Sequence, residues 1–343
     1  MTTRRRLLGL LLPAASALSP AAPAAFDLHR IDQLFGDLRK DQYADLQGVR
    51  ILSEGRLVAE SYFNGGDPER LHDIRSAGKS ITSLLTGIAI DQKLISGVHV
   101  PLSHLLPPAS RPDLESVTLE DLLTMRSGFS ADDEDPASPG NEDRMDASPS
   151  WLNFALAVPL REKPGQRYQY SSLNAFLTGV CVENASGKSL DAFARQHLFG
   201  PLGIDNFTWR KGPQGRVAGQ GNLRITLSAM SALGQMCLNH GRVASTQVVS
   251  AQWIERSLSS IVSISHTDPF ADWYGYMWYT KTHEVAGRPI RVHFASGNGG
   301  NKIYIVPELK TVVAIASVAY GRPYGQRRSQ QILLEILGAS QSA

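Results

Sequence analysis

Hydrophobic and polar positions along the chain predict strands near both ends and helices between them. Short runs of alternating or continuous apolar residues, rich in β-branched side chains, are typical of strands. Glu54-Gly55 separates the first two runs as a hairpin turn. Apolar residues recur at helical spacing over 27–40, over most of 80–285 and again near 330–337. The predicted strands are residues 48–52, 57–63, 290–294, 303–306 and 312–316.

This order of elements predicts an α+β fold. One antiparallel sheet would be assembled from both termini and flanked by helices, with a mostly helical lobe inserted between its halves. We expect the α/β lobe to comprise about residues 26–80 and 286–343, and the helical lobe about 81–285. A binding site is expected between the lobes.

Residues 131–149 interrupt the helical pattern with acidic residues, proline, serine and asparagine. The segment is predicted to be a long surface loop, and loops of this length are often functional. Its acids, with Asp132-Asp133-Glu134-Asp135 at the head of the segment, are interpreted as solvated.

The first 25 residues have the composition of an export signal. Arg4-Arg5-Arg6 precedes the apolar run 7–12, and small residues and prolines follow as far as Ala25. Residues 3–8 also resemble a twin-arginine signal. The sequence therefore predicts an exported, periplasmic protein with one domain over 26–343.

Charge excludes one class of partner. The formal charge of the 343-residue chain is +2, but the predicted signal contains three arginines and no acid, so the remainder carries −1. No basic stripe is left to bind nucleic acid, and no other apolar stretch is long enough for a membrane span. Cys181 and Cys237 lie in apolar, helical patterns, where either a disulfide or two buried free thiols is possible.

Ser76 and Lys79 form the first candidate for chemistry, at the predicted start of a helix. The spacing of three residues places the hydroxyl beside the amine. A serine hydroxyl needs a neighbour to accept its proton, and a lysine can do so where burial lowers its pKa enough to leave it neutral. The helix start also favours developing negative charge.

Two further segments contain groups that could take part in the same reaction as Ser76 and Lys79. Tyr170-Ser171-Ser172 follows a Pro-Gly turn at a loop-to-helix junction, from which a phenol can project and transfer protons. Ala295-Ser296-Gly297-Asn298 ends an alternating strand and leads into more glycines, which allow close backbone approach. The N–H of Asn298 could pair with the N–H of Ser76 as an oxyanion hole.

Together these segments resemble the serine β-lactamase and penicillin-binding protein superfamily, and class C β-lactamase-like hydrolases in particular. Further similarity is found in Leu122-Leu123-Thr124-Met125-Arg126-Ser127-Gly128, Pro201-Leu202-Gly203-Ile204 and Tyr274-Gly275-Tyr276-Met277-Trp278.

The resemblance implies a fold and a set of roles. The fold would be β-lactamase/transpeptidase-like, with Ser76 as the acylated nucleophile, Lys79 as its proton acceptor and Tyr170 as general base or acid. The N–H groups of Ser76 and Asn298 would hold the oxyanion, and Gly297 and Ser172 would contact the substrate. No metal or organic cofactor is implied, and the partner would be a small-molecule ester or amide.

Two departures from the family's motifs concern the substrate. Ser172 stands where the family usually has asparagine, and Ala295 where it usually has lysine or histidine. The missing cation predicts weak turnover of penicillins and resembles the family's esterases and nylon-oligomer hydrolases. The alternatives are a periplasmic D,D-peptidase or weak β-lactamase, and a non-catalytic penicillin-binding-like peptide-recognition module.

Overall fold

A computed structural model describes residues 25–106 and 111–341. The predicted export segment lies outside the described residues except for Ala25, which pairs with Gln341 in a two-residue ladder between β1 and β15. These two strands span Ala25–Phe26 and Ser340–Gln341.

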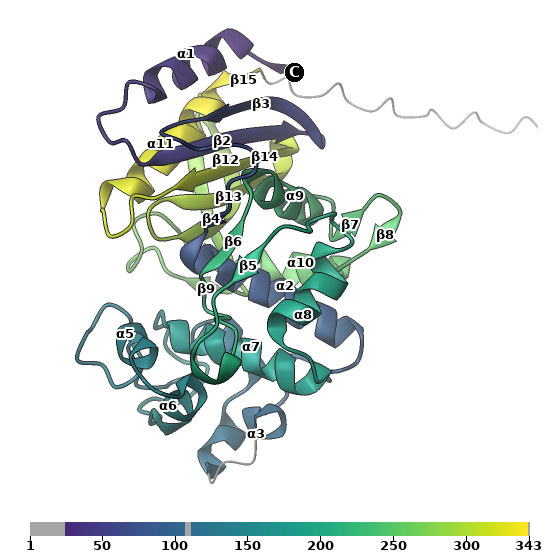
Figure 1. The fold of residues 1–343 in the computed structure, drawn as a ribbon, viewed down its shortest axis with the longest axis vertical. Coiled ribbons are helices and arrows are strands. Elements are labelled where there is room, and N and C mark those ends of the chain that lie inside the picture. The colour runs from purple at the N-terminus through teal and green to yellow at the C-terminus, as the bar shows by residue number, and fades with distance from the viewer. Residues whose placement is uncertain (1–24, 107–110, 342–343) are drawn as a thin grey trace, which may run out of the picture.

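The centre of the α/β lobe is an eight-stranded sheet in the order β3-β2-β14-β13-β12-β11-β10-β9, and every neighbouring pair is antiparallel (Figure 1). Both termini contribute to it, because β2 pairs with β14. The predicted fold class is confirmed. The strands are β2 (Leu46–Ser53), β3 (Arg56–Tyr62), β9 (Val262–Ser263), β10 (Trp273–Tyr274), β11 (Tyr279–Val285), β12 (Arg288–Gly297), β13 (Asn301–Val306) and β14 (Thr311–Ser317).

The predicted hairpin joins β2 to β3. Glu54 and Gly55 have φ angles of 49° and 77°. Positive φ at both central residues matches the twist of an antiparallel pair, which is why glycine suits the second position.

The expected lobe boundary at residue 286 is wrong, because β9, β10 and β11 precede it and still belong to the sheet. Two of these strands contain only two residues each, too few to leave a periodic pattern. The helix α9 (Leu227–Leu238) also packs on the sheet, and a Cβ added to its Gly234 would lie 2.7 Å from Val312.

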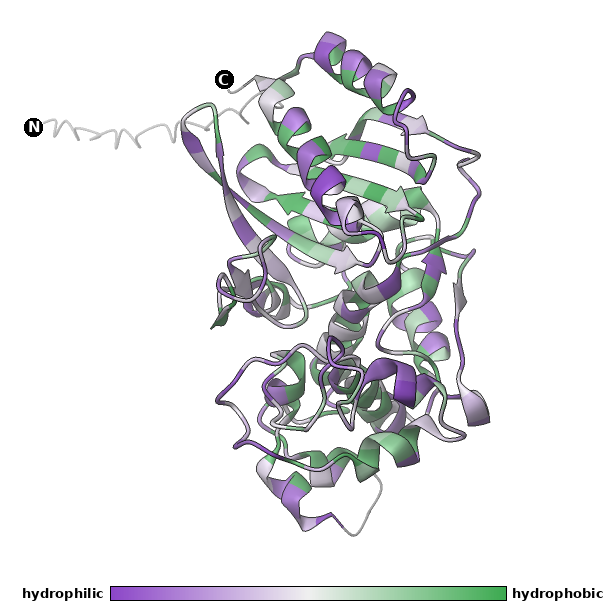
Figure 2. Ribbon diagram, turned by 90° about the vertical axis from the view of Figure 1, so that its left-hand side faces the viewer, coloured by the Kyte–Doolittle hydropathy of each residue, from purple (hydrophilic) through white to green (hydrophobic). Residues whose placement is uncertain are grey.

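Helices cover the sheet and build the second lobe. In Figure 1, α1 and α11 lie over the sheet, and α3 and α5–α8 form the lower part of the molecule. In Figure 2, hydrophobic residues follow the strands behind α11, whereas hydrophilic residues alternate along that helix. Across the described ranges, no helix combines the length and apolarity that a membrane crossing requires. The remaining helices are α1 (Leu28–Leu38), α2 (Gly78–Asp91), α3 (Leu102–Leu105), α4 (Leu119–Leu123), α5 (Glu142–Asp146), α6 (Trp151–Ala157), α7 (Ser172–Ser186), α8 (Leu190–Ala194), α10 (Ala251–Ser257) and α11 (Tyr324–Ala339).

Smaller sheets complete the fold. One has the strand order β4-β6-β5 and leads directly to the turn before α2, and the other is the hairpin β7–β8. Their strands are β4 (His72–Asp73), β5 (Thr208–Trp209), β6 (Leu223–Ile225), β7 (Arg242–Val243) and β8 (Thr246–Gln247).

The helix α2 is buried on every side, from Gly78 to Ala89. Its sequence separates an apolar face from a face of small and polar residues, which would suit a half-exposed helix. Both faces are covered because α7 packs against it from the helical lobe and β12 from the sheet. The polar residues on α2 therefore face the protein interior.

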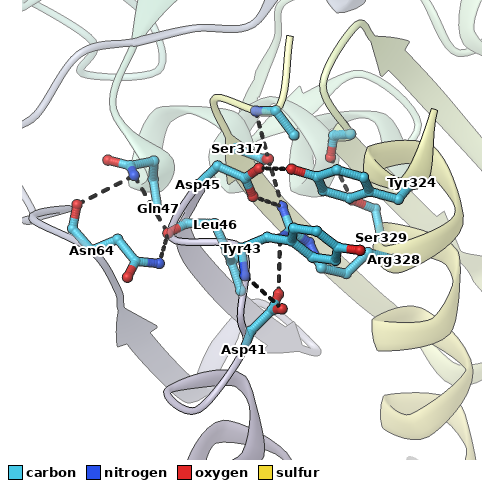
Figure 3. Close-up of polar contacts among 12 residues, drawn as sticks. Asp41, Tyr43, Asp45, Leu46, Gln47, Asn64, Ser317, Tyr324, Arg328 and Ser329 are labelled. Atoms are coloured by element: carbon cyan, nitrogen blue, oxygen red, sulfur yellow. Dashed lines mark hydrogen bonds and ion pairs between the residues drawn. The ribbon is translucent and has the colours of Figure 1, made fainter. Parts of the chain in front are cut away.

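A buried ion cluster ties the C-terminal helix to the segment after α1 (Figure 3). Arg328 of α11 donates to Asp41 Oδ2 at 2.9 Å and to Ser317 Oγ at 2.9 Å, and it pairs with Asp45 Oδ1 at 2.5 Å. Tyr324 also donates to Asp45. Since a buried guanidinium needs such partners, the cluster fixes α11 against the N-terminal part of the sheet.

The two cysteines are far apart in the fold and do not form a disulfide. Cys181 lies in α7 and Cys237 in α9, and both are free and buried. Burial raises the pKa of the Cys237 thiol to about 12 and that of Cys181 well above its usual range. The alternative of two buried free thiols is confirmed.

Candidate active site

Ser76 lies in a 3₁₀ turn, Arg75–Ala77, that leads directly into α2. Arg75 has a φ of 51°, which residues other than glycine rarely adopt, and its N–H donates to Asp73 Oδ1 at 2.9 Å. The Tyr320 hydroxyl donates to the Asp73 carbonyl oxygen at 2.9 Å. The turn is thus held so that Ser76 is half-buried at the positive end of the α2 dipole.

Lys79 brings the predicted residues together. Its side chain is buried, and its Nζ donates to Ser76 Oγ at 2.9 Å, to Ser172 Oγ at 3.0 Å and to the Gln220 carbonyl oxygen at 2.8 Å. The Tyr170 ring centre lies 5.0 Å from the same nitrogen. All three ammonium hydrogens have acceptors, so the amine has a fixed position. Gln220 binds Lys79 through its backbone carbonyl oxygen. A contact of this kind does not depend on the side chain, so the sequence did not indicate it.

The electrostatics of Lys79 differ from the expectation. Burial alone would lower its pKa, but the electrostatic influence of Tyr170, Glu142 and Asp133 outweighs burial, and the pKa is raised. The condition under which Lys79 could accept the serine proton, a pKa lowered by burial, is therefore not met. In the resting site Lys79 is an ammonium.

Asp133 and Glu142 belong to the acidic segment that was interpreted as solvated, and for these two residues the interpretation is wrong. Asp133 Oδ2 accepts a hydrogen bond from the Ser172 N–H at 2.7 Å, and its Oδ1 is buried without a partner among the described residues. Glu142 begins α5, whose N-cap is Asn141. Burial raises the pKa of both carboxyl groups, and the Lys79 ammonium opposes that rise.

A row of aromatic rings in mutual contact extends from Tyr168 to β12. The ring centres of Tyr168 and Tyr274 are 5.4 Å apart, those of Tyr274 and Tyr279 are 4.8 Å apart, and Tyr279 stacks on Phe294 at 5.3 Å. Burial raises the pKa of Tyr168, Tyr274 and Tyr279 well above the usual value. These three phenols are therefore neutral and contribute packing to this part of the molecule.

The end of β12 touches the turn that holds Ser76. A Cβ added to Gly297 would lie 2.0 Å from the Ile74 carbonyl oxygen and 3.2 Å from the Ala77 nitrogen, so only glycine allows this approach. It brings Asn298 beside the same turn. Within the described ranges no residue accepts a hydrogen bond from the Asn298 N–H, while the Asn298 side chain accepts one from Gly321 at 2.8 Å.

The arrangement resembles a site for acyl transfer. A hydroxyl lies at a helix start within hydrogen-bond reach of a fixed ammonium, a phenol lies beside that ammonium, and a backbone N–H from a neighbouring strand is free. These are the parts that nucleophilic attack on a carbonyl and stabilisation of an oxyanion require.

Comparisons with known proteins agree with this geometry. The chain is 24% identical over 330 residues to the 6-aminohexanoate-dimer hydrolase of Paenarthrobacter ureafaciens, which covers 89% of this chain and 82% of the relative. A solved hydrolase with promiscuous acyltransferase activity superposes with a TM-score of 0.71 at 14% identity, over 90% of this chain and 98% of the other. A class C β-lactamase gives a TM-score of 0.69 at 14% identity, over 92% and 96% of the two chains.

The similarity to these solved structures concerns the fold. The family model described as Beta-lactamase matches residues 32–336, which include both lobes and every candidate site residue. The chain therefore belongs to the β-lactamase family.

Proposed function

We propose that the protein is a serine hydrolase that forms an acyl-enzyme on Ser76 and cleaves ester or amide bonds of small substrates. The observation that carries the proposal is the 2.9 Å hydrogen bond from the buried Lys79 ammonium to Ser76 Oγ. A structural lysine in the interior would be expected to pair with a carboxylate, whereas this one points at a half-buried hydroxyl beside a free backbone donor.

The raised pKa of Lys79 favours its neighbour as the proton acceptor. Ser76 Oγ attacks the carbonyl carbon while its proton passes to Tyr170 as general base, and the Lys79 ammonium stabilises the charge that develops there. The oxyanion is held by the N–H groups of Ser76 and Asn298. When the intermediate collapses, the carbon–oxygen or carbon–nitrogen bond breaks and Tyr170 protonates the leaving group. Water then repeats the sequence and frees Ser76.

Substrate size and type follow from the site and the relatives. Ser172 and Gly297 would contact the substrate, and the family's usual cation is absent at Ala295. The relative that matches most of the chain is named for hydrolysis of an aminohexanoate dimer, a short amide, and a fold neighbour is a hydrolase with acyltransferase activity. Short esters and amides are the substrates that we propose.

Covalent labelling tests the proposal. After incubation with a fluorophosphonate, intact-protein mass spectrometry is expected to show one adduct, and peptide mapping is expected to place it on Ser76. The matched control is Ser76→Ala, which should acquire no adduct under the same conditions. An unlabelled wild-type protein, or equal labelling of the variant, would contradict the proposal and favour a non-catalytic recognition module.

Asp133→Asn is expected to change the pH profile of the reaction. The carboxylate helps to raise the pKa of Lys79, so its neutral replacement lowers that pKa. If Lys79 must be protonated, kcat/KM is lost as the pH rises through its pKa, and the alkaline limb should move to lower pH by about one unit.

Glu134→Gln is the matched control for Asp133→Asn, because Glu134 is exposed in the same segment. The alkaline limb of its kcat/KM profile against pH should coincide with that of the wild type. Identical limbs in Asp133→Asn and the wild type would show that Asp133 does not act on Lys79.

Export is a separate proposal that rests on the N-terminal sequence alone. A basic segment, an apolar run and small residues precede the domain, and we propose that they direct the protein to the periplasm.

A further inference from the structure

Lys79 is a buried ammonium whose direct contacts carry no charge. Its Nζ donates to Ser76 Oγ, Ser172 Oγ and the Gln220 carbonyl oxygen, and all three acceptors are neutral oxygens. The side chain is 2% exposed. Because burying a charge without compensation is costly, a negative charge has to act on Lys79 from beyond these immediate contacts.

Ser172 connects Lys79 to two carboxyl groups. Its Oγ accepts from Lys79 at 3.0 Å, and its N–H donates to Asp133 Oδ2 at 2.7 Å. Because the hydroxyl oxygen already accepts a hydrogen bond, its own hydrogen is free to be donated, and the carboxyl groups of Asp133 and Glu142 both lie within hydrogen-bond reach. Ser172 is fully buried, so bulk water does not screen this connection.

The buried side chain of Asn141 ties the two acids together. Its Nδ2 donates to the Asp133 carbonyl oxygen at 3.2 Å. Its Oδ1 accepts from the Asp143 N–H at 3.0 Å, as the N-cap of α5, and Glu142 is the first residue of that helix. The loop that carries Asp133 and the helix that carries Glu142 are therefore fixed relative to each other.

Two carboxylates beside one ammonium would leave an excess negative charge in a poorly solvated site. Burial raises the pKa of Asp133 and of Glu142, Asp133 raises that of Glu142 further, and Lys79 opposes both shifts. The neighbouring acids Asp132 and Asp146 add to the rise in Asp133 and Glu142 respectively. Asp133 Oδ1 is buried without a partner among the described residues, so it can accept a hydrogen from a second carboxyl group. Carboxyl groups in such a position titrate as a pair and do not ionise independently.

We propose that Asp133 and Glu142 share one proton, and that the single negative charge left on the pair is the counter-ion of Lys79, with the Ser172 hydroxyl between them. Either carboxyl group can carry this charge while the other holds the proton. Glu142 is then a positioning residue, since it acts through the pair on the ammonium that contacts Ser76. The inference rests on the proposed function, in which Lys79 is positively charged.

A double substitution tests the pair by its kinetics. Asp133→Asn and Glu142→Gln each leave one carboxylate to carry the charge, so each is expected to lower kcat/KM for a neutral 4-nitrophenyl ester by less than about tenfold at about pH 7. The double variant has no carboxylate left in the pair. Its loss should exceed the product of the two single losses and reach about a thousandfold, whereas independent structural roles would give the simple product.

The matched control is the double variant Glu134→Gln/Asp143→Asn, which neutralises two exposed acids in the same segment of the chain. Its kcat/KM should equal that of the wild type, because neither acid contacts Ser172 or Lys79.

Infrared spectroscopy detects the shared proton directly. At about pH 7 an exposed acid is a carboxylate, whereas the shared proton should produce the carbonyl stretching band of a protonated carboxyl group. The band is expected in the wild type and in Glu134→Gln/Asp143→Asn. It should be absent from Asp133→Asn and from Glu142→Gln, because the remaining acid of the pair is ionised. A merely structural role of Glu142 would not remove this band.

The outcomes separate the two proposals. If the wild type is not labelled at Ser76 by a fluorophosphonate, the proposed function fails, and the infrared band still reports on the pair. If the wild type is labelled but lacks the band, if the band persists in both single variants, or if the double variant loses no more than the product of the single losses, the shared proton alone is overturned. Circular dichroism reports whether the double variant has folded, and if it has not, the spectra of the single variants decide.

Discussion

Lys79→Met is expected to lower kcat/KM for a neutral 4-nitrophenyl ester by at least about a thousandfold. The substitution removes the ammonium that contacts Ser76 Oγ and Ser172 Oγ and that lies 5.0 Å from the Tyr170 ring centre. Methionine has a similar volume, so the surrounding helices can keep their packing. Steady-state hydrolysis of the ester gives the rate.

The control for this variant is Lys188→Met, which makes the same change at an exposed position after α7. Its rate should equal that of the wild type. Unfolding in urea, followed by circular dichroism, should show that both variants are folded in water. A loss of less than tenfold for Lys79→Met would mean that another group performs its role.

Gly297→Ala is expected to reduce kcat by about a hundredfold or more. The new methyl group would lie 2.0 Å from the Ile74 carbonyl oxygen, far inside any permitted contact, and the obstacle is backbone that cannot rotate away. The end of β12 must therefore withdraw from the turn, which separates the Asn298 N–H from the Ser76 N–H. Loss of one oxyanion donor has an effect of this size.

Gly36→Ala is the matched control, because a Cβ on Gly36 in α1 would meet nothing within 4 Å. This variant should keep the wild-type kcat and gain stability slightly, since alanine is favoured inside a helix. Gly297→Ala should remain capable of binding substrate, with KM changed less than kcat. Unchanged kcat in Gly297→Ala would remove Asn298 from the proposed oxyanion hole.

The sequence predicted the parts of the sheet that have a clear local signal. The hairpin through Glu54-Gly55 combines two strands with a suitable turn, β12 alternates apolar and polar residues, and β13 and β14 contain apolar runs. The strands β9 and β10 escaped prediction because two residues cannot display a period. β10 pairs with the edge of β11, and β9 pairs in turn with β10.

The sequence predicts which motifs form the candidate site, but it does not predict the protonation states of the residues in it. Ser76 and Lys79 are three residues apart on one helix, so their contact follows from helix geometry. Asp133 reaches Ser172 from a loop 39 residues earlier in the chain, and composition alone suggested a solvated position for that loop. The Asp133 carboxylate, held near the site by this distant contact, is one of the groups that raise the pKa of Lys79.

The pairing of β2 with β14 affects the order in which the proposed site is assembled. Ser76 and Lys79 are synthesised long before Gly297 and Asn298, which face the same turn. A nascent chain would thus carry the proposed nucleophile without its second amide donor or the strand that pairs with β2. Such long-range pairing makes folding slow, and the site has both amide donors only after β12 has been synthesised and has joined the sheet.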